Sequence, residues 1–218
     1  LDNRDVHAKL LELLKHGKLS ENQETWLIWA LGRMRDVDTL SDLLVSHLHP
    51  ESAASLNLQV QSIRILAYRS KQFSKLDRLS ESLRVALKHS QPRVRFAAIL
   101  AIHETRQMEQ IPDLLAAIQI ESDSTIFYAA WKALSALSSS KELRERLNDS
   151  RANVRRAALL GLLEAHLLAP ADVRSLAEKE IDPEVRQVAE LWLSKSGQNK
   201  PRIEGRSLQA ASAEATTN

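Results

Sequence analysis

The sequence contains no cysteine, which excludes disulfides, thiolate metal sites, cysteine nucleophiles and covalent c-type haem attachment. Glycine and proline are scarce, with 5 and 6 among 218 residues, whereas all-β proteins need such residues in their many turns. No apolar run approaches the roughly 20 residues that span a bilayer. The formal net charge of +2 is too small to indicate a polyanionic partner by itself. Together these absences favour long helices joined by short connections.

One stretch, residues 90–104, shows the pattern that recurs along the chain. Ser90 is a plausible N-cap, and Pro92 lies in the first turn, where a missing N–H costs nothing. After it, apolar residues recur at the three-and-four spacing of an amphipathic helix: Val94, Ala97, Ala98, Ala101 and Ile102. Because adjacent inward positions are alanine, another backbone can approach closely, as in a helix packed between copies of itself.

The small position occupied by Ala101 has counterparts along the chain, and between them lie leucine-rich helices. The counterparts are separated by intervals of 37, 34, 32, 28 and 31 residues, within the range of helical repeats: Ala30, Ala67, Ala133, Gly161 and Trp192. The leucine-rich helices are expected at Val6–His16, Thr39–Leu48, Leu76–Lys88, Ile111–Ile120, Lys141–Leu147 and Ala171–Glu180. The sequence therefore predicts an all-α solenoid of about six stacked hairpins over residues 1–195. The bulky Trp26, Trp29 and Trp192 are expected to fill the core of the less regular end units.

Residues 196–218 lack this periodicity and end in small polar residues, which predicts a flexible tail or linker. Within them, Ile203–Arg206 reads IEGR, the recognition sequence of a processing protease used in cloning, and its origin stays open. The chain starts at Leu1 without a signal-peptide pattern, so we expect a processed product or a piece of a longer protein. The sequence assigns no compartment.

No catalytic, metal or cofactor site is predicted. His47 and His49 lie two residues apart, and positions two apart on a helix face different sides. His103 and Glu104 begin like a zinc-protease helix, but Gln107 stands where the second histidine belongs. No glycine-rich phosphate loop or nucleophile elbow is present. We therefore expect a protein without enzymatic activity and without a cofactor.

Three stretches resemble the second helices of HEAT repeats, particularly the short bacterial type related to bilin lyases. They read PRVRFAAILAI, ANVRRAALLGLLEA and DPEVRQVAELWL, and each has a Val-Arg pair followed by small residues. The arginines are Arg95, Arg155 and Arg186, and Phe127 replaces the arginine in DSTIFYAAWKAL. The chain is also similar to the HEAT segments of larger multidomain bacterial proteins. The resemblance implies a right-handed α–α superhelix.

The resemblance further implies two roles for basic residues. In HEAT arrays the arginine of the Val-Arg pair commonly forms an ion pair with an acidic residue of a turn and joins neighbouring repeats. The candidate acidic partners here are Asp123, Asp149 and Asp182. The second helices of such arrays line a concave groove, and in this chain their basic residues outnumber the acidic ones twelve to five. A mildly basic groove follows, with six predicted binding residues: Arg33, Arg64, Arg69, Arg93, Lys132 and Arg156.

Three functions are consistent with this sequence. The first is a non-catalytic scaffold or spacer whose groove holds a protein partner or a neighbouring domain of a longer chain. The second is a binder of nucleic-acid phosphates, as in HEAT-like DNA-repair glycosylases, and its affinity would fall steeply with salt. The third is a lyase that attaches or removes bilin chromophores, which would bind the chromophore in the groove.

Overall fold

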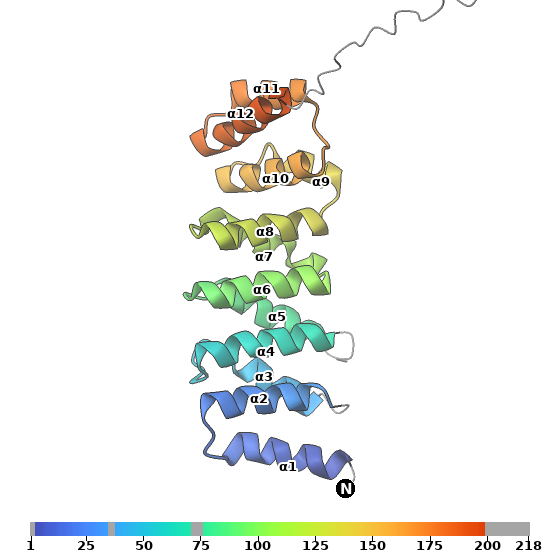
Figure 1. The fold of residues 1–218 in the computed structure, drawn as a ribbon, viewed down its shortest axis with the longest axis vertical. Coiled ribbons are helices and arrows are strands. Elements are labelled where there is room, and N and C mark those ends of the chain that lie inside the picture. Colours follow the sequence, from blue (N-terminus) through green and yellow to red (C-terminus); the bar gives the residue numbers. More distant parts are fainter. Residues whose placement is uncertain (1–2, 35–37, 71–75, 199–218) are drawn as a thin grey trace, which may run out of the picture.

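The computed structural model describes residues 3–34, 38–70 and 76–198, and over these ranges the chain is helical and contains no strand. The helices stack in a single column (Figure 1). They are α1 (Asn3–His16), α2 (Glu21–Gly32), α3 (Asp38–Ser46), α4 (Leu56–Arg69), α5 (Leu76–Leu87), α6 (Pro92–Thr105), α7 (Ile111–Ile120), α8 (Ser124–Leu137), α9 (Ser140–Arg146), α10 (Ala152–Glu164), α11 (Pro170–Lys179) and α12 (Pro183–Gln198), with a 3₁₀ turn η2 (Met108–Gln110). The prediction of an all-α solenoid is confirmed, and all six leucine-rich helices begin and end within three residues of their expected bounds.

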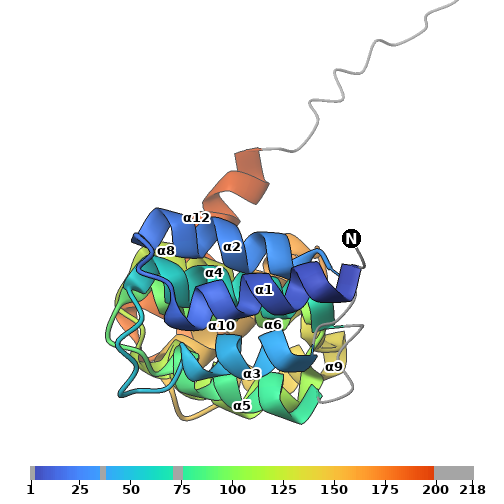
Figure 2. The same ribbon diagram turned by 90° about the horizontal axis from the view of Figure 1, so that it is seen from below.

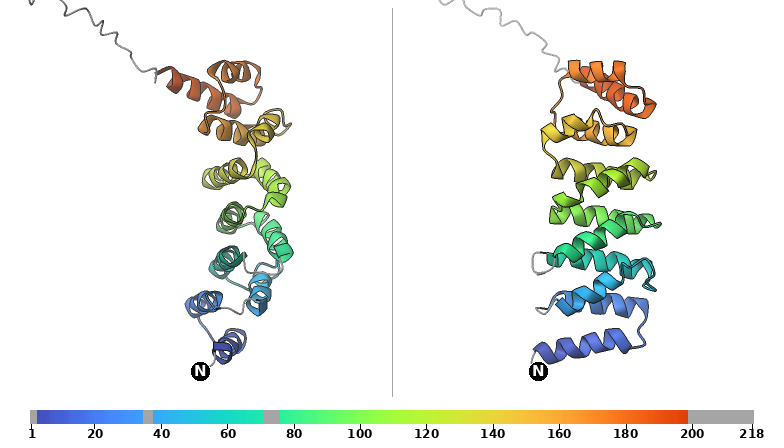
Figure 3. Two further views of the ribbon diagram at one scale, coloured as in Figure 1. Left: turned by 90° about the vertical axis from the view of Figure 1, so that its right-hand side faces the viewer. Right: turned by 180° about the vertical axis from the view of Figure 1, so that it is seen from behind.

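The column has two layers. Helices α2, α4, α6, α8, α10 and α12 pack consecutively on one another in the front layer of Figure 1, which we call the second-helix layer. Helices α3, α5 and α7 form the layer behind. Seen from the N-terminal end, α2 lies on one side of the column and α3 and α5 on the other (Figure 2). The column bows, and the second-helix layer lies on the inner side of the curve (Figure 3, left). The right-handed sense of the superhelix stays a prediction.

Helix starts follow the local sequence. Asp123 caps α8, since its carboxylate accepts hydrogen bonds from the backbone N–H of Thr125 and Ile126. Ser139 forms a capping box with Glu142 at the start of α9. At α6, Pro92 is the first helical residue and Gln91, rather than Ser90, takes the N-cap position.

Small inward residues let the second helices approach closely. In α6 the five predicted core residues, Val94 to Ile102, are all at most 4% exposed. Gly161 of α10 packs against Ser135 of α8, where a Cβ would lie 2.1 Å from the serine oxygen. Gly32 of α2 packs against Ile65 of α4, where a Cβ would lie 2.8 Å from Cγ2. Small residues at these contacts therefore set the distance between neighbouring helices of the second-helix layer.

The predicted inward face of α2 is wrong. Ala30 is exposed and Trp26 is 77% exposed, whereas Ile28 and Leu31 are fully buried. Trp29 is partly buried and packs against the core, as does Trp192 of α12. Because α2 is apolar on several sides, its pattern does not single out one buried stripe.

The last helix continues past the predicted boundary at residue 195. Helix α12 runs to Gln198, and its end projects beyond the column (Figure 2). The predicted tail, including the IEGR sequence, lies otherwise outside the described residues. Among the helices that the structure describes, none is long and apolar enough to cross a membrane.

Candidate functional site

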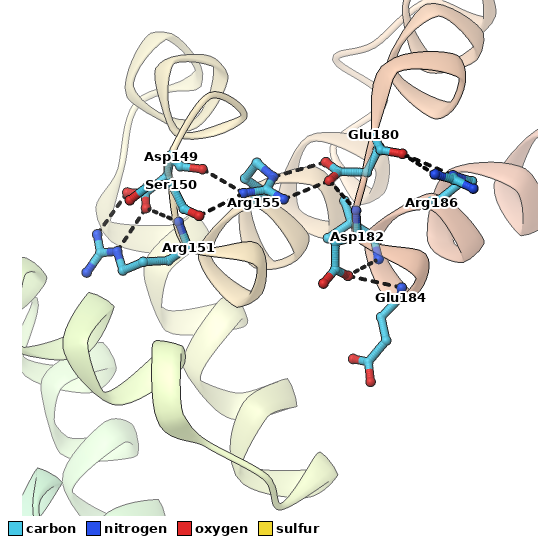
Figure 4. Close-up of polar contacts among 9 residues, drawn as sticks. Asp149, Ser150, Arg151, Arg155, Glu180, Asp182, Glu184 and Arg186 are labelled. Carbon is cyan, nitrogen blue, oxygen red and sulfur yellow. Dashed lines mark hydrogen bonds and ion pairs between the residues drawn. The ribbon is translucent and has the colours of Figure 1, made fainter.

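A ladder of arginine side chains joins successive repeats along the edge of the stack. Arg155 of α10 donates from Nε and Nη2 to both carboxylate oxygens of Glu180, at 3.0 and 2.7 Å. Its Nη1 donates to the backbone carbonyls of Asp149 and Ser150, at 2.8 and 3.1 Å. The Arg155 guanidinium therefore joins the turn before α10 to the turn before α12, which is the next helix of the second-helix layer (Figure 4). Such a bidentate pair is directional as well as strong.

The same arrangement occurs two levels earlier in the stack, on α6. Arg95 of α6 donates to both oxygens of Glu121, at 2.8 and 2.9 Å, and to the carbonyls of His89 and Ser90, both at 3.0 Å. The Glu121 and Glu180 side chains are only 5% and 7% exposed. This repetition makes the arginines structural and not part of an open binding surface.

The acidic partners differ from those that the family resemblance implied. Asp123 and Asp182 cap the following helices by accepting backbone N–H groups, so their carboxylates are already engaged. The glutamate two residues earlier takes the arginine instead, and also accepts the N–H of the aspartate, at 3.0 Å for Glu121 and 2.9 Å for Glu180. The turns at residues 121–123 and 180–182 therefore share a Glu-x-Asp pattern, in which the glutamate pairs with the arginine and the aspartate caps the next helix.

The ladder carboxylates are held in their charged form. Hydrogen bonds from Arg155, supported by the backbone N–H of Asp182, lower the pKa of Glu180. Burial would raise the pKa of Glu121, but the hydrogen bonds from Arg95 and the backbone outweigh it, and the net shift is downward. The pKa values of Arg95 and Arg155 are raised chiefly by the same hydrogen bonds.

Two levels of the ladder depart from the pattern. Phe127 stands at the arginine position of α8, so Asp149, in the place of the glutamate, pairs with Arg151 of its own turn at 2.8 Å. The hydrogen bonds from Arg151 lower the pKa of Asp149 to about 2. At the end of the stack, Arg186 donates only to the backbone carbonyl of Glu180 and is exposed (Figure 4).

The structure places the six predicted groove residues in three different situations. Arg69 is buried, at 7% exposure, and donates to the carbonyl of Met34, so it joins α4 to the end of α2. Lys132 pairs with Glu164 at 2.8 Å, and Arg156 pairs with Glu184. The other three are exposed and form no ion pair within the described part of the chain: Arg33, Arg64 and Arg93.

Arg156 also lies over the ring of Phe127, with the guanidinium carbon 4.1 Å from the ring centroid. The cation is thus held between a carboxylate of α12 and an aromatic face of α8. Lys132 likewise lies 5.4 Å from the ring centroid of Trp131. On α8 and α10, therefore, the predicted binding cations already have partners within the chain.

The front of α2, α4 and α6 is hollowed in two places. A hollow of about 480 Å³ is lined by Thr25, Trp26, Trp29, Ala30, Arg33 and Gln61. A second of about 300 Å³ lies where Arg64, Arg93 and Phe96 meet the start of α8. Trp26 was not predicted at the surface, because the predicted buried face of α2 is shifted by one residue from the buried face in the structure.

Among the described residues, no group of three or more histidine, cysteine or acidic side chains is arranged so that it could hold a metal ion. Nδ1 of His47 lies 2.8 Å from the Ser62 hydroxyl, and burial lowers the pKa of this histidine. The imidazole is therefore a polar contact between the turn after α3 and α4.

The comparison with protein families agrees with this architecture. Residues 80–164, from within α5 to the end of α10, match the family model for HEAT repeats. None of the curated proteins compared with the chain matches it significantly. HEAT repeats generally act as protein-interaction scaffolds and are typically non-catalytic. The matched segment consists of HEAT repeats, and the described helices on either side of it continue the same solenoid stacking.

Proposed function

We propose that this chain is a non-catalytic scaffold that holds a protein partner, or a neighbouring domain of a longer chain, against its second-helix layer. The observation that carries the proposal is where the exposed aromatic side chains lie. Trp26, Tyr68 and Tyr128 are 77%, 66% and 55% exposed, and all three belong to α2, α4 and α8 of that layer. Aromatic residues are enriched at protein interfaces and supply much of their binding energy.

The alternatives have weaker support. A phosphate backbone needs several free cations, and three of the six predicted ones are engaged by a carboxylate or a backbone carbonyl. For a bilin lyase, the described residues that line the two hollows include one carboxylate, that of Asp123, and no histidine. A scaffold requires only a shaped, exposed surface.

The test is a pull-down with the 218-residue chain as bait, compared with two triple variants of equal charge change. The first reverses the free cations of the second-helix layer: Arg33→Glu, Arg64→Glu and Arg93→Glu. The second reverses exposed cations outside the second-helix layer, in the turn after α5, in α9 and in α11: Lys88→Glu, Lys141→Glu and Arg174→Glu. We expect the same protein to be recovered by the wild type and the second variant and lost with the first. Equal recovery by both variants, each folded by circular dichroism, would refute the proposal.

A further inference from the structure

The charges of the second-helix layer are divided unevenly along the stack. In the C-terminal half, Lys132, Arg155 and Arg156 are each paired with a carboxylate of a neighbouring repeat. In the N-terminal half, Arg33 at the C-cap of α2, Arg64 of α4 and Arg93 of α6 have no such partner among the described residues. Three cations of the C-terminal half are therefore engaged by carboxylates, whereas three cations of the N-terminal half keep their charge without an ion pair among the described residues.

The hollow beside these arginines is apolar and held rigidly. The Trp29 indole N–H donates to Gln61 at 3.1 Å, and the Gln61 amide donates to Asn57 at 3.4 Å. Asn57 in turn donates to Thr25 at 3.2 Å, so four polar side chains tie α2 to α4. With Trp29 fixed on one side and Trp26 exposed on the other, the hollow can take a bulky apolar side chain without rearranging.

The second hollow continues this surface. It brings Arg64 and Arg93 to the edge of the partly buried Phe96 ring. Asp123 also lines it, but its carboxylate already accepts two backbone N–H groups at the start of α8. The charged side chains that line the hollow are therefore two guanidinium groups and one carboxylate, which leaves an excess of one positive charge.

We infer that this surface, defined by Trp26, Trp29, Arg33, Arg64, Arg93 and Phe96, binds an extended acidic peptide segment of a partner protein through an apolar anchor and a row of carboxylates. The inference rests on the proposed scaffold function and names the partner's chemistry. Carboxylates match guanidinium groups in charge and in bidentate geometry. An apolar anchor matches the tryptophan-lined hollow.

Helix packing sets the spacing of the peptide's groups. Neighbouring helix axes lie about 8–10 Å apart, and an extended chain advances about 3.3 Å per residue. Carboxylates about three residues apart therefore meet arginines on successive helices. The probe that follows is a fluorescein-labelled peptide with one phenylalanine and aspartates three and six positions after it, joined by glycine and serine.

Fluorescence anisotropy with the full chain tests the inference. We expect saturable binding that weakens at least about tenfold when the aspartates become asparagines, or when the phenylalanine becomes alanine. The Arg33→Gln, Arg64→Gln, Arg93→Gln variant should lose at least about tenfold in affinity, as should Trp26→Ala. The matched control Lys88→Gln, Lys141→Gln, Arg174→Gln should bind like the wild type.

Three outcomes would overturn the inference: no binding by the folded wild type, equal binding of the asparagine peptide, or equal loss in the control variant. Tighter binding of a single-stranded oligonucleotide to the same arginines would assign the surface to phosphates instead. The peptide could fail to bind while the Arg33→Glu, Arg64→Glu, Arg93→Glu variant still loses the protein recovered in the pull-down. In that case the scaffold function stands and only the acidic-peptide inference is refuted.

Discussion

The ladder makes a quantitative prediction for the pair Arg155 and Glu180. Their side chains are 17% and 7% exposed, and two hydrogen bonds join them. A hydrogen bond to a charged group contributes about 1.5–3 kcal/mol, and truncating one partner of a fully buried pair costs about 3–5 kcal/mol. Because Arg155 is partly solvated, we expect Arg155→Met to destabilise the interface between α10 and the α11–α12 hairpin by about 2–3 kcal/mol.

The assay is a double-mutant cycle with Arg155→Met and Glu180→Gln, followed by urea unfolding and amide hydrogen exchange. In a solenoid each repeat is held by its neighbours, so the loss should appear as opening of the terminal hairpin α11–α12. A loss of about 2–3 kcal/mol corresponds to a decrease of about 30–150-fold in the exchange protection of these helices. The coupling energy in the cycle should be at least about 1.5 kcal/mol.

The pair Lys132 and Glu164 is the matched control. It also joins adjacent second helices at 2.8 Å, but its side chains are 37% and 50% exposed. Exposed pairs contribute about 0–1 kcal/mol, so its coupling energy should fall in that range. If the two cycles give equal coupling, or if exchange in α11–α12 is unchanged by Arg155→Met, the ladder does not hold the repeats together.

Three further predictions concern packing, acid stability and capping. Gly32→Ala should lower the free energy of unfolding by about 1–3 kcal/mol, because the new Cβ would lie 2.8 Å from buried Ile65; an unchanged melting temperature would contradict this close approach. The pKa of Asp149 is about 2 in the folded chain, below its unfolded value, so its stabilising effect is present at neutral pH and is lost as the pH falls from about 5 towards about 2. Asp149→Asn should therefore flatten the pH dependence of urea unfolding in that window, and an unaltered profile would argue against the Arg151 pair. Ser139→Ala removes the cap of α9 and should cost about 1 kcal/mol, measured by urea unfolding against the exposed-helix control Lys141→Ala.

The helices could be predicted from the sequence because their signals are local. Apolar spacing and start residues such as Pro92 place the helix bounds within a few residues. The exception is α2, whose apolar residues surround the axis, so that Trp26 and Ile28 are equally plausible core residues. Packing against α4 decides between them, and the sequence of α2 alone does not contain that information.

The ladder could be predicted only in part. Its arginines follow from the Val-Arg pattern, but both carboxylates of each Glu-x-Asp turn are close enough in sequence to serve as the partner. The choice depends on which one faces the backbone N–H groups of the next helix, which takes Asp123 and Asp182 out of competition. Local capping thus determined the long-range contact.

The state of the groove cations was the least predictable feature. Lys132 and Glu164 are 32 residues apart, and their contact depends on the relative register of two helices. Arg69 is buried because its helix ends beside the carbonyl of Met34, 35 residues earlier. A count of basic residues on the second helices treats all of these as free charges, whereas three of the six predicted binding residues are engaged within the described part of the chain.

The replacement of an arginine by Phe127 has a mechanical consequence. A bidentate ion pair resists sliding because small shifts misalign its hydrogen bonds, whereas a cation over a ring face keeps most of its attraction when it moves sideways. Between α8 and α10 the stack has the second kind of contact, through Phe127 and Arg156, and the ion pair that the described residues form there, Lys132 with Glu164, is exposed and does not involve a guanidinium. We therefore expect the solenoid to bend more easily between α8 and α10 than elsewhere, while the segments on either side of this joint keep their curvature.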